Sequence, residues 1–297
     1  RRQEDARPLR EEKTMQFFDD EEPVEILSPT AEMMPVFDAI RESFERLAAL
    51  PHANAVSLAW DDIAFTQTGT ELARWYFGRN GLSICIEDPD DAMLGDLYHW
   101  VENHFNVMSG ADLDDRLEYL AGNNQTPTRF RTIREAAAVS ELVRHEVGLG
   151  WGGFSAVVDK EDEARLRRLR IFTDYYRQTI EWPLLRTADL AATCALIVAS
   201  QLLGMTSPAR AEILFARPAG ELIVRFRSWT DVAESLLVRD AFVALETSES
   251  AALQAVRRSY IFLESLLSGP WKTLSWIRVA QEELPDVTPK PTVSGNL

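Results

Sequence analysis

Four histidines leave this sequence few groups for acid–base or metal chemistry, and one spacing among them matters most. Asp96 and His99 stand three residues apart in a helical pattern, which places a carboxylate and an imidazole on one helix face. Glu141 and His145, four residues apart, form the nearest second pair. A dimetal site in a helix bundle needs two Glu-x-x-His pairs and further glutamates from facing helices. These four residues are the candidate metal ligands, and a solvated polar face is the favoured alternative.

An arginine-rich segment offers a different chemistry, contact with nucleic acid. On a helix its arginines form two short rows, followed by two tyrosines at 175–176. Arginine makes planar, bidentate contacts with phosphate, and tyrosine rings stack on bases. Three acidic residues at 161–163 lie one turn upstream and can pair with the same arginines. The candidate nucleic-acid contacts are Arg165, Arg167, Arg168, Arg170 and Arg177.

The glycine-rich segment 148–153 resembles a phosphate-binding loop only in composition. Such loops follow a strand and open a helix whose N-terminal amides face the anion. Here a helical pattern precedes the glycines and an apolar run follows them. The segment is therefore predicted to be a hinge between two parts of the chain.

Tryptophan is abundant, with eight residues, and aromatic residues are enriched at protein interfaces. Trp151 lies in the glycine-rich segment. Trp271 and Trp276 fall on a last helix predicted from Trp271 to Glu283, beside the C-terminal tail. These three tryptophans are the candidate interface residues, and burial in the chain's own core is the alternative.

Motifs of the common enzyme classes are missing from the sequence. It contains no Gly-x-Ser-x-Gly elbow, no nucleotide-binding P-loop and no His-Glu-x-x-His. Adjacent acid pairs such as Asp114-Asp115 point in different directions on a helix, which makes them poor catalytic dyads. The sequence therefore predicts a protein that is not an enzyme and binds no cofactor, with a helical metal–carboxylate enzyme as the last alternative.

Helical periodicity dominates the chain and predicts a mainly α fold. The apolar stretch Leu190–Met205 also carries threonine, serine, glutamine and glycine, so it is predicted to be a buried core helix without a membrane span. Ser228 and Asp231 form a capping pair that begins another helix. The remaining helices are predicted at 36–50, from 88 to 108, and at 109–121, 128–147, 161–180 and 253–267.

One or two small β-hairpin elements are expected beside these helices. Residues 212–216 and 221–226, joined by a Pro-Ala-Gly turn, are the best candidate because apolar side chains alternate in the second half. The short apolar run Leu82–Ile86 predicts a further strand. The fold class is thus an irregular helical domain with small β elements and extended arms at both ends.

The net charge of -16 is unevenly distributed. Between Asp61 and Glu118 thirteen acidic residues face three arginines, whereas between Lys160 and Asp240 twelve basic residues face eleven acidic ones. An acidic half joined to a neutral, arginine-rich half favours electrostatic contacts between copies of the chain.

Composition divides the chain into four predicted parts. Residues 1–27 are too polar to bury much apolar surface and form an N-terminal arm, and the proline-rich residues 285–297 form a C-terminal tail. Between them lie an acidic, mostly helical part at 28–150 and an arginine-rich helical part at 151–284, with the hairpin near 211–227. Both arms are expected to contact neighbouring subunits.

Two distant cysteines, Cys85 and Cys194, sit in apolar stretches and are predicted to be buried thiols. With no disulfide framework or signal peptide, we expect an intracellular protein, soluble in the cytoplasm or held within a particle.

The leading hypothesis is an acidic, helical structural protein that self-assembles into a homo-oligomer or forms a fixed subunit of a large particle. A coat or capsid-like shell is its most specific version, with protein–protein contacts through the terminal arms. Its partners are copies of itself or other subunits. Nucleic-acid packaging by the arginine-rich helix is the alternative.

Overall fold

The computed structural model describes residues 27–51, 62–122, 125–136, 160–176, 185–274 and 276. Within these ranges every regular element is helical, which confirms the mainly α prediction. Nearly all of the predicted N-terminal arm, the glycine-rich hinge and the C-terminal tail lie outside them. The elements are α1 (Met34–Ala48), α2 (Asp62–Arg79), α3 (Asp91–Phe105), α4 (Gly110–Gly122), α5 (Gln125–Ala136), α7 (Lys160–Tyr175), α8 (Thr187–Leu202), α9 (Pro208–Arg225), α10 (Trp229–Ala244), α11 (Glu249–Ser268) and the short 3-10 helix η2 (Pro270–Thr273).

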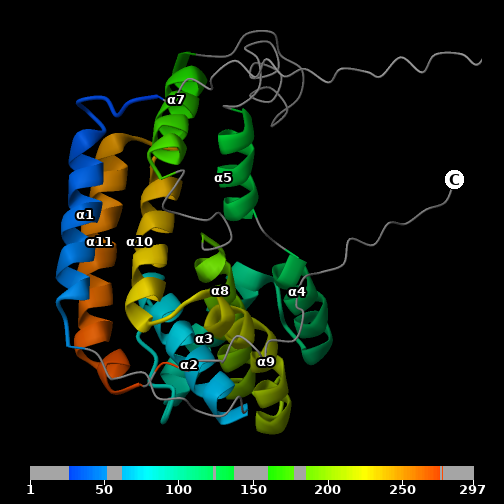
Figure 1. The fold of residues 1–297 in the computed structure, drawn as a ribbon. Helices are drawn as coiled ribbons and strands as arrows, with labels where there is room; N and C mark the ends of the chain where they lie inside the picture. Colours follow the sequence, from blue (N-terminus) through cyan, green and yellow to red (C-terminus); the bar gives the residue numbers. More distant parts are fainter. Residues whose placement is uncertain are drawn as a thin grey trace, which may run out of the picture.

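Most of the helices form two groups that share one core, and α5 packs on α7 beside them (Figure 1). In the first group α1, α10 and α11 pack side by side. In the second α2, α8 and α9 pack on one another, and α3 and α4 lie against α8. Helices from both sides of residue 150 occur in each group, so the two predicted central parts of the chain pack together.

Helix α8 lies in the middle of the second group and is buried on all sides. Every residue from Ala191 to Ser200 is buried, because alanine, leucine, isoleucine and valine surround the helix axis. The prediction of a buried core helix is confirmed. In the described ranges, none of the helices combines the length and apolar character needed to cross a membrane.

Helix α2 approaches its neighbours closely at two glycines. A methyl group added at Gly69 would lie 2.6 Å from Cε1 of the buried Phe215 of α9. At Gly78 the added methyl would lie 2.8 Å from Cε2 of Phe262 of α11. Because glycine has no side chain, α2 contacts both helix groups at short range.

The predicted hairpin near 211–227 is wrong, since these residues belong to the single helix α9. Its buried residues Ala211, Phe215, Ala219 and Leu222 recur every three or four positions, which is the helical period. Pro218, expected in a turn, lies inside the helix on its buried side. It removes one backbone hydrogen bond, and the packing of α9 against α2 and α8 offsets that cost.

Two smaller expectations near the chain surface are also corrected. Leu82–Ile86 forms no strand but a loop whose side chains alternate between half-buried and exposed. Cys85 is consequently exposed, whereas Cys194 in α8 is buried as predicted. The chain around Trp271 forms η2 and is no longer helical at Leu274, so the predicted last helix is wrong over these residues.

Helix starts agree best with the sequence. The Ser228 hydroxyl accepts a hydrogen bond from the Asp231 amide (3.1 Å), and the Asp231 carboxylate accepts one from the Arg227 amide (2.9 Å). This reciprocal pair confirms the predicted cap of α10. The helix predicted from residue 88 begins three residues later, at Asp91, and its N-cap is Asp90, whose carboxylate accepts a hydrogen bond from the Met93 amide (2.8 Å).

Candidate functional site

The most concentrated polar chemistry in the described ranges lies where the two helix groups meet. Asp240 of α10 has a side chain that is 1% exposed, although it carries a carboxylate. Its Oδ2 accepts hydrogen bonds from Nε of Arg79 in α2 (3.1 Å) and Oγ of Ser259 in α11 (3.0 Å). Its Oδ1 accepts one from Nη1 of Arg239 (3.2 Å). One buried carboxylate thereby joins α2, α10 and α11.

Asp189, in the first turn of α8, is a second buried carboxylate near these arginines. Its Oδ2 is buried and accepts no hydrogen bond among the described residues. Burial raises the pKa of Asp189 to about 6, while the positive charges of Arg239 and Arg186 oppose the rise. The carboxyl therefore exchanges its proton closer to neutrality than an ordinary aspartate.

Arg186, at the N-cap of α8, continues the network toward the other helices of its group. Its guanidinium pairs with Glu221 of α9 (3.1 Å) and donates to the Ala121 carbonyl in the last turn of α4. Glu221 also pairs with Arg225, one helical turn onward (3.1 Å). Opposite charges therefore alternate in two sets of ion pairs, and the charges of Arg239 and Arg186, one from each set, act on Asp189. The sets are Arg79, Asp240 and Arg239, and Arg186, Glu221 and Arg225.

This network is suited to holding helices together. Alternating charges lower the desolvation cost of each ion, and hydrogen bonds fix the orientation of each guanidinium. The sequence interpretation missed it, although a signal is present. Arg239 and Asp240 interrupt an otherwise apolar run in α10, where a charged pair is unexpected unless it is paired in the fold.

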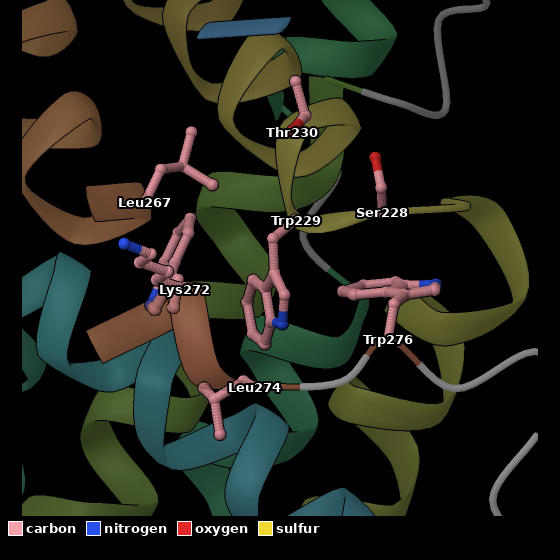
Figure 2. A pocket seen from close by; sticks show the side chains of 8 residues that line it. Ser228, Trp229, Thr230, Leu267, Lys272, Leu274 and Trp276 are labelled. Atoms are coloured by element: carbon pink, nitrogen blue, oxygen red, sulfur yellow. The ribbon is translucent and has the colours of Figure 1, made fainter. Parts of the chain in front are cut away.

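A second candidate is a cluster of three tryptophans beside η2. The rings of Trp229 and Trp271 have centroids 4.5 Å apart, and those of Trp229 and Trp276 are 5.1 Å apart at 86°. Nε1 of Trp276 donates to the Phe226 carbonyl (3.0 Å). The hollow between them, shown in Figure 2, offers about 20 Å³ of free space, room for about one water molecule.

The structure describes two of the three tryptophans that were predicted to lie at an interface. The chain itself buries Trp271 and Trp276, so its own packing is enough to explain these two rings. Trp151 lies outside the described residues. An interface role for the three tryptophans stays a prediction.

The predicted nucleic-acid contacts on α7 take up different positions. Arg168 faces inward and donates from Nε to the Leu245 carbonyl (3.1 Å) and from Nη2 to the Thr247 carbonyl (3.2 Å), at the end of α10. Nε of Arg170 lies 3.7 Å from Oδ2 of the buried Asp174. Arg165 is half-buried, Arg167 is exposed, and Arg177 lies outside the described residues. Nucleic-acid contact stays a prediction, and part of the arginine cluster is engaged within the fold.

The predicted metal ligands are only partly described. Asp96 and His99 lie on the exposed face of α3, and Nδ1 of His99 is 3.7 Å from Oε2 of Glu102. Glu141 and His145 lie outside the described ranges. Across the residues that are described, no group of three or more potential ligands lies together. The metal site and the enzyme alternative that depends on it stay predictions.

The raised pKa of Glu234 in α10 predicts that the stability of the fold depends on pH. Burial raises its pKa to about 7 from 4.5, and the nearby Asp231 carboxylate adds to the rise. The folded state thus binds a proton that the unfolded state releases, so this contribution to stability falls as pH rises from about 4.5 to 7. At pH 8 the free energy of unfolding of Glu234→Gln, measured with urea, is expected to be about 1 kcal/mol higher than that of the native chain. The gain stays this small because solvent screens a partly exposed carboxyl.

At pH 4 the Glu234→Gln variant and the native chain are expected to have equal stability, because the glutamate is then protonated in both states. Glu118→Gln, at an exposed position of α4, controls for the loss of one negative charge. An effect of Glu234→Gln that is the same at pH 4 and pH 8 contradicts the prediction.

No family model, no curated protein and no solved structure matches this chain. We therefore infer the function from the helix arrangement and from the arginine–carboxylate contacts.

Proposed function

We propose that this chain is a non-enzymatic structural protein that self-assembles or serves as a fixed subunit of a larger, coat-like particle. One observation carries the proposal. The chain joins its own distant segments by arginine contacts, and it exposes unused groups of the same kind on different helices.

The internal contacts establish the chemistry. Arg79 binds Asp240 across the two helix groups, and Arg210 of α9 pairs with Asp114 of α4. Arg168 binds carbonyl oxygens at the end of α10. Each contact joins segments far apart in the sequence, so arginine serves this chain as its means of connecting helices.

The unused acids and the unused arginines lie on different segments of the chain. In the parts of the chain that are described, several exposed acids of the 62–122 region form no ion pair, and the same holds for exposed arginines of α9 and α11. Opposite charges on different faces attract when two copies meet. The acids are Asp88, Asp91, Asp96, Asp115 and Glu118, and the arginines are Arg217, Arg257 and Arg258.

The test is the mass of the purified chain by light scattering over a range of salt concentrations. At low salt we expect a species larger than the 33.6 kDa chain, which dissociates as salt screens the charges. A 33.6 kDa monomer at every salt and protein concentration would rule out self-assembly.

The absorbance ratio at 260 and 280 nm on the same peak tests the alternative of nucleic-acid packaging. Deletion of residues 1–25 or 285–297 tests the arms, because loss of an assembling arm leaves a folded but smaller species. If deletion of both leaves the mass unchanged, the arms are not the contacts.

A further inference from the structure

We infer that the contact between copies joins the outer face of α4 in one copy to the outer face of α9 in a second copy. This inference rests on the proposed self-assembly and names the surfaces that carry it. Both faces combine an exposed apolar side chain with unpaired charge, and the charges have opposite sign.

The face of α9 is apolar and basic. Ile213 is 73% exposed and Val224 is 40% exposed, the first being the most exposed large apolar side chain among the described residues. Arg217 lies between them on the same helix face, four residues after Ile213 and seven before Val224. Arg227, exposed as well, follows the helix by two residues. Neither arginine forms an ion pair with another described residue.

The face of α4 is aromatic and acidic. Tyr119 is 51% exposed, and the Arg116 guanidinium lies 4.7 Å from its ring centroid. Asp115 and Glu118 lie three residues apart on one row of α4, and Asp115 precedes Tyr119 by four residues, so Tyr119 borders this acidic row. Both are exposed, and neither pairs with another described group. Aromatic side chains are enriched in protein interfaces, whose rim is polar.

The two helices already recognise each other once within the chain. Arg210, in the first turn of α9, pairs with Asp114 of α4, so the start of α9 lies beside α4 within one chain. A two-fold axis near this pair brings α4 of each copy onto α9 of the other, and the contact then occurs twice. Complementary charge therefore selects a second copy as the occupant of both faces.

The experiment uses charge reversal in the full chain. Arg217→Glu with Arg227→Glu makes both faces acidic, and Asp115→Arg with Glu118→Arg makes both faces basic. Each double variant alone is expected to be a monomer at the concentration where the native chain associates. An equimolar mixture is expected to regain the native mass, because each acidic face then meets a basic one.

Arg41→Glu with Arg46→Glu, at exposed positions of α1 whose ion pairs are local, is the matched control and is expected to keep the native mass. If the native chain associates and both test variants associate equally well, or if the control also dissociates, this assignment of faces is overturned while self-assembly stands. A native chain that remains a monomer refutes the proposed function itself. Circular dichroism of each variant verifies that the helices remain folded.

Discussion

Asp240→Asn is expected to destabilise the fold by about 3 kcal/mol, because it removes the charge of a buried carboxylate that two arginines share. The amide keeps the shape of the side chain, but its NH2 group faces arginine donors in place of an oxygen. Arg79 and Arg239 then lose part of their charge pairing, and the buried Ser259 hydroxyl competes for one oxygen. Urea unfolding followed by circular dichroism measures the change in the free energy of unfolding.

Asp114→Asn is the matched control for this exchange. Asp114 also pairs with an arginine, Arg210, but both side chains are about half exposed, so the loss is expected to stay below about 1 kcal/mol. In a double-mutant cycle, Arg79→Met should cost less when Asp240 is already asparagine. Equal losses at Asp240 and Asp114 would show that burial does not strengthen the network.

Gly69→Ala is expected to destabilise the protein by about 2 kcal/mol, although alanine favours a helix over glycine by about 1 kcal/mol. The added methyl meets the ring of Phe215, which is buried and cannot swing aside. Helices α2 and α9 must therefore separate, and both lose packing. Thermal and urea unfolding of the variant measure the loss.

Two variants show whether the contact itself causes this effect. Gly95→Ala in α3 adds a methyl that meets no atom within 4 Å, so it is expected to stabilise the chain by about 0.5–1 kcal/mol. In the presence of Phe215→Leu, Gly69→Ala should cost less, since the smaller side chain leaves room. If Gly69→Ala is as stable as the native chain, α2 and α9 do not approach as closely as the structure has them.

The sequence was most informative where one face of a helix meets solvent. The capping pair Ser228 and Asp231 and the apolar stripe of α11 depend on neighbours within a few residues, so local pattern predicts them. Helix α2 was not predicted from the sequence. It is covered by α8, α9 and α11, and its glycines and threonines weaken the helical signal, so no one-sided stripe marks it.

The candidate site also depends on contacts between distant residues, which a local sequence pattern does not reveal. Asp240, Arg79 and Ser259 belong to three helices, and no spacing in the sequence relates residues 161 positions apart. The hairpin prediction failed because alternation over five residues outweighed the helical period of the whole segment. A proline within a buried helix is tolerated only through tertiary packing, which local rules do not include.

The pairing of early with late helices has a consequence for how the chain is made. Helix α1 packs on α10 and α11. The Leu27 amide donates a hydrogen bond to Asp174, 147 positions later, and Arg79 pairs with Asp240, 161 positions later. On the ribosome the first helices emerge with their apolar faces uncovered until nearly the whole chain has followed. Native contacts of such long sequence separation form slowly, so we expect the apolar faces of α1 and α2 to be exposed to aggregation until α11 has been synthesised.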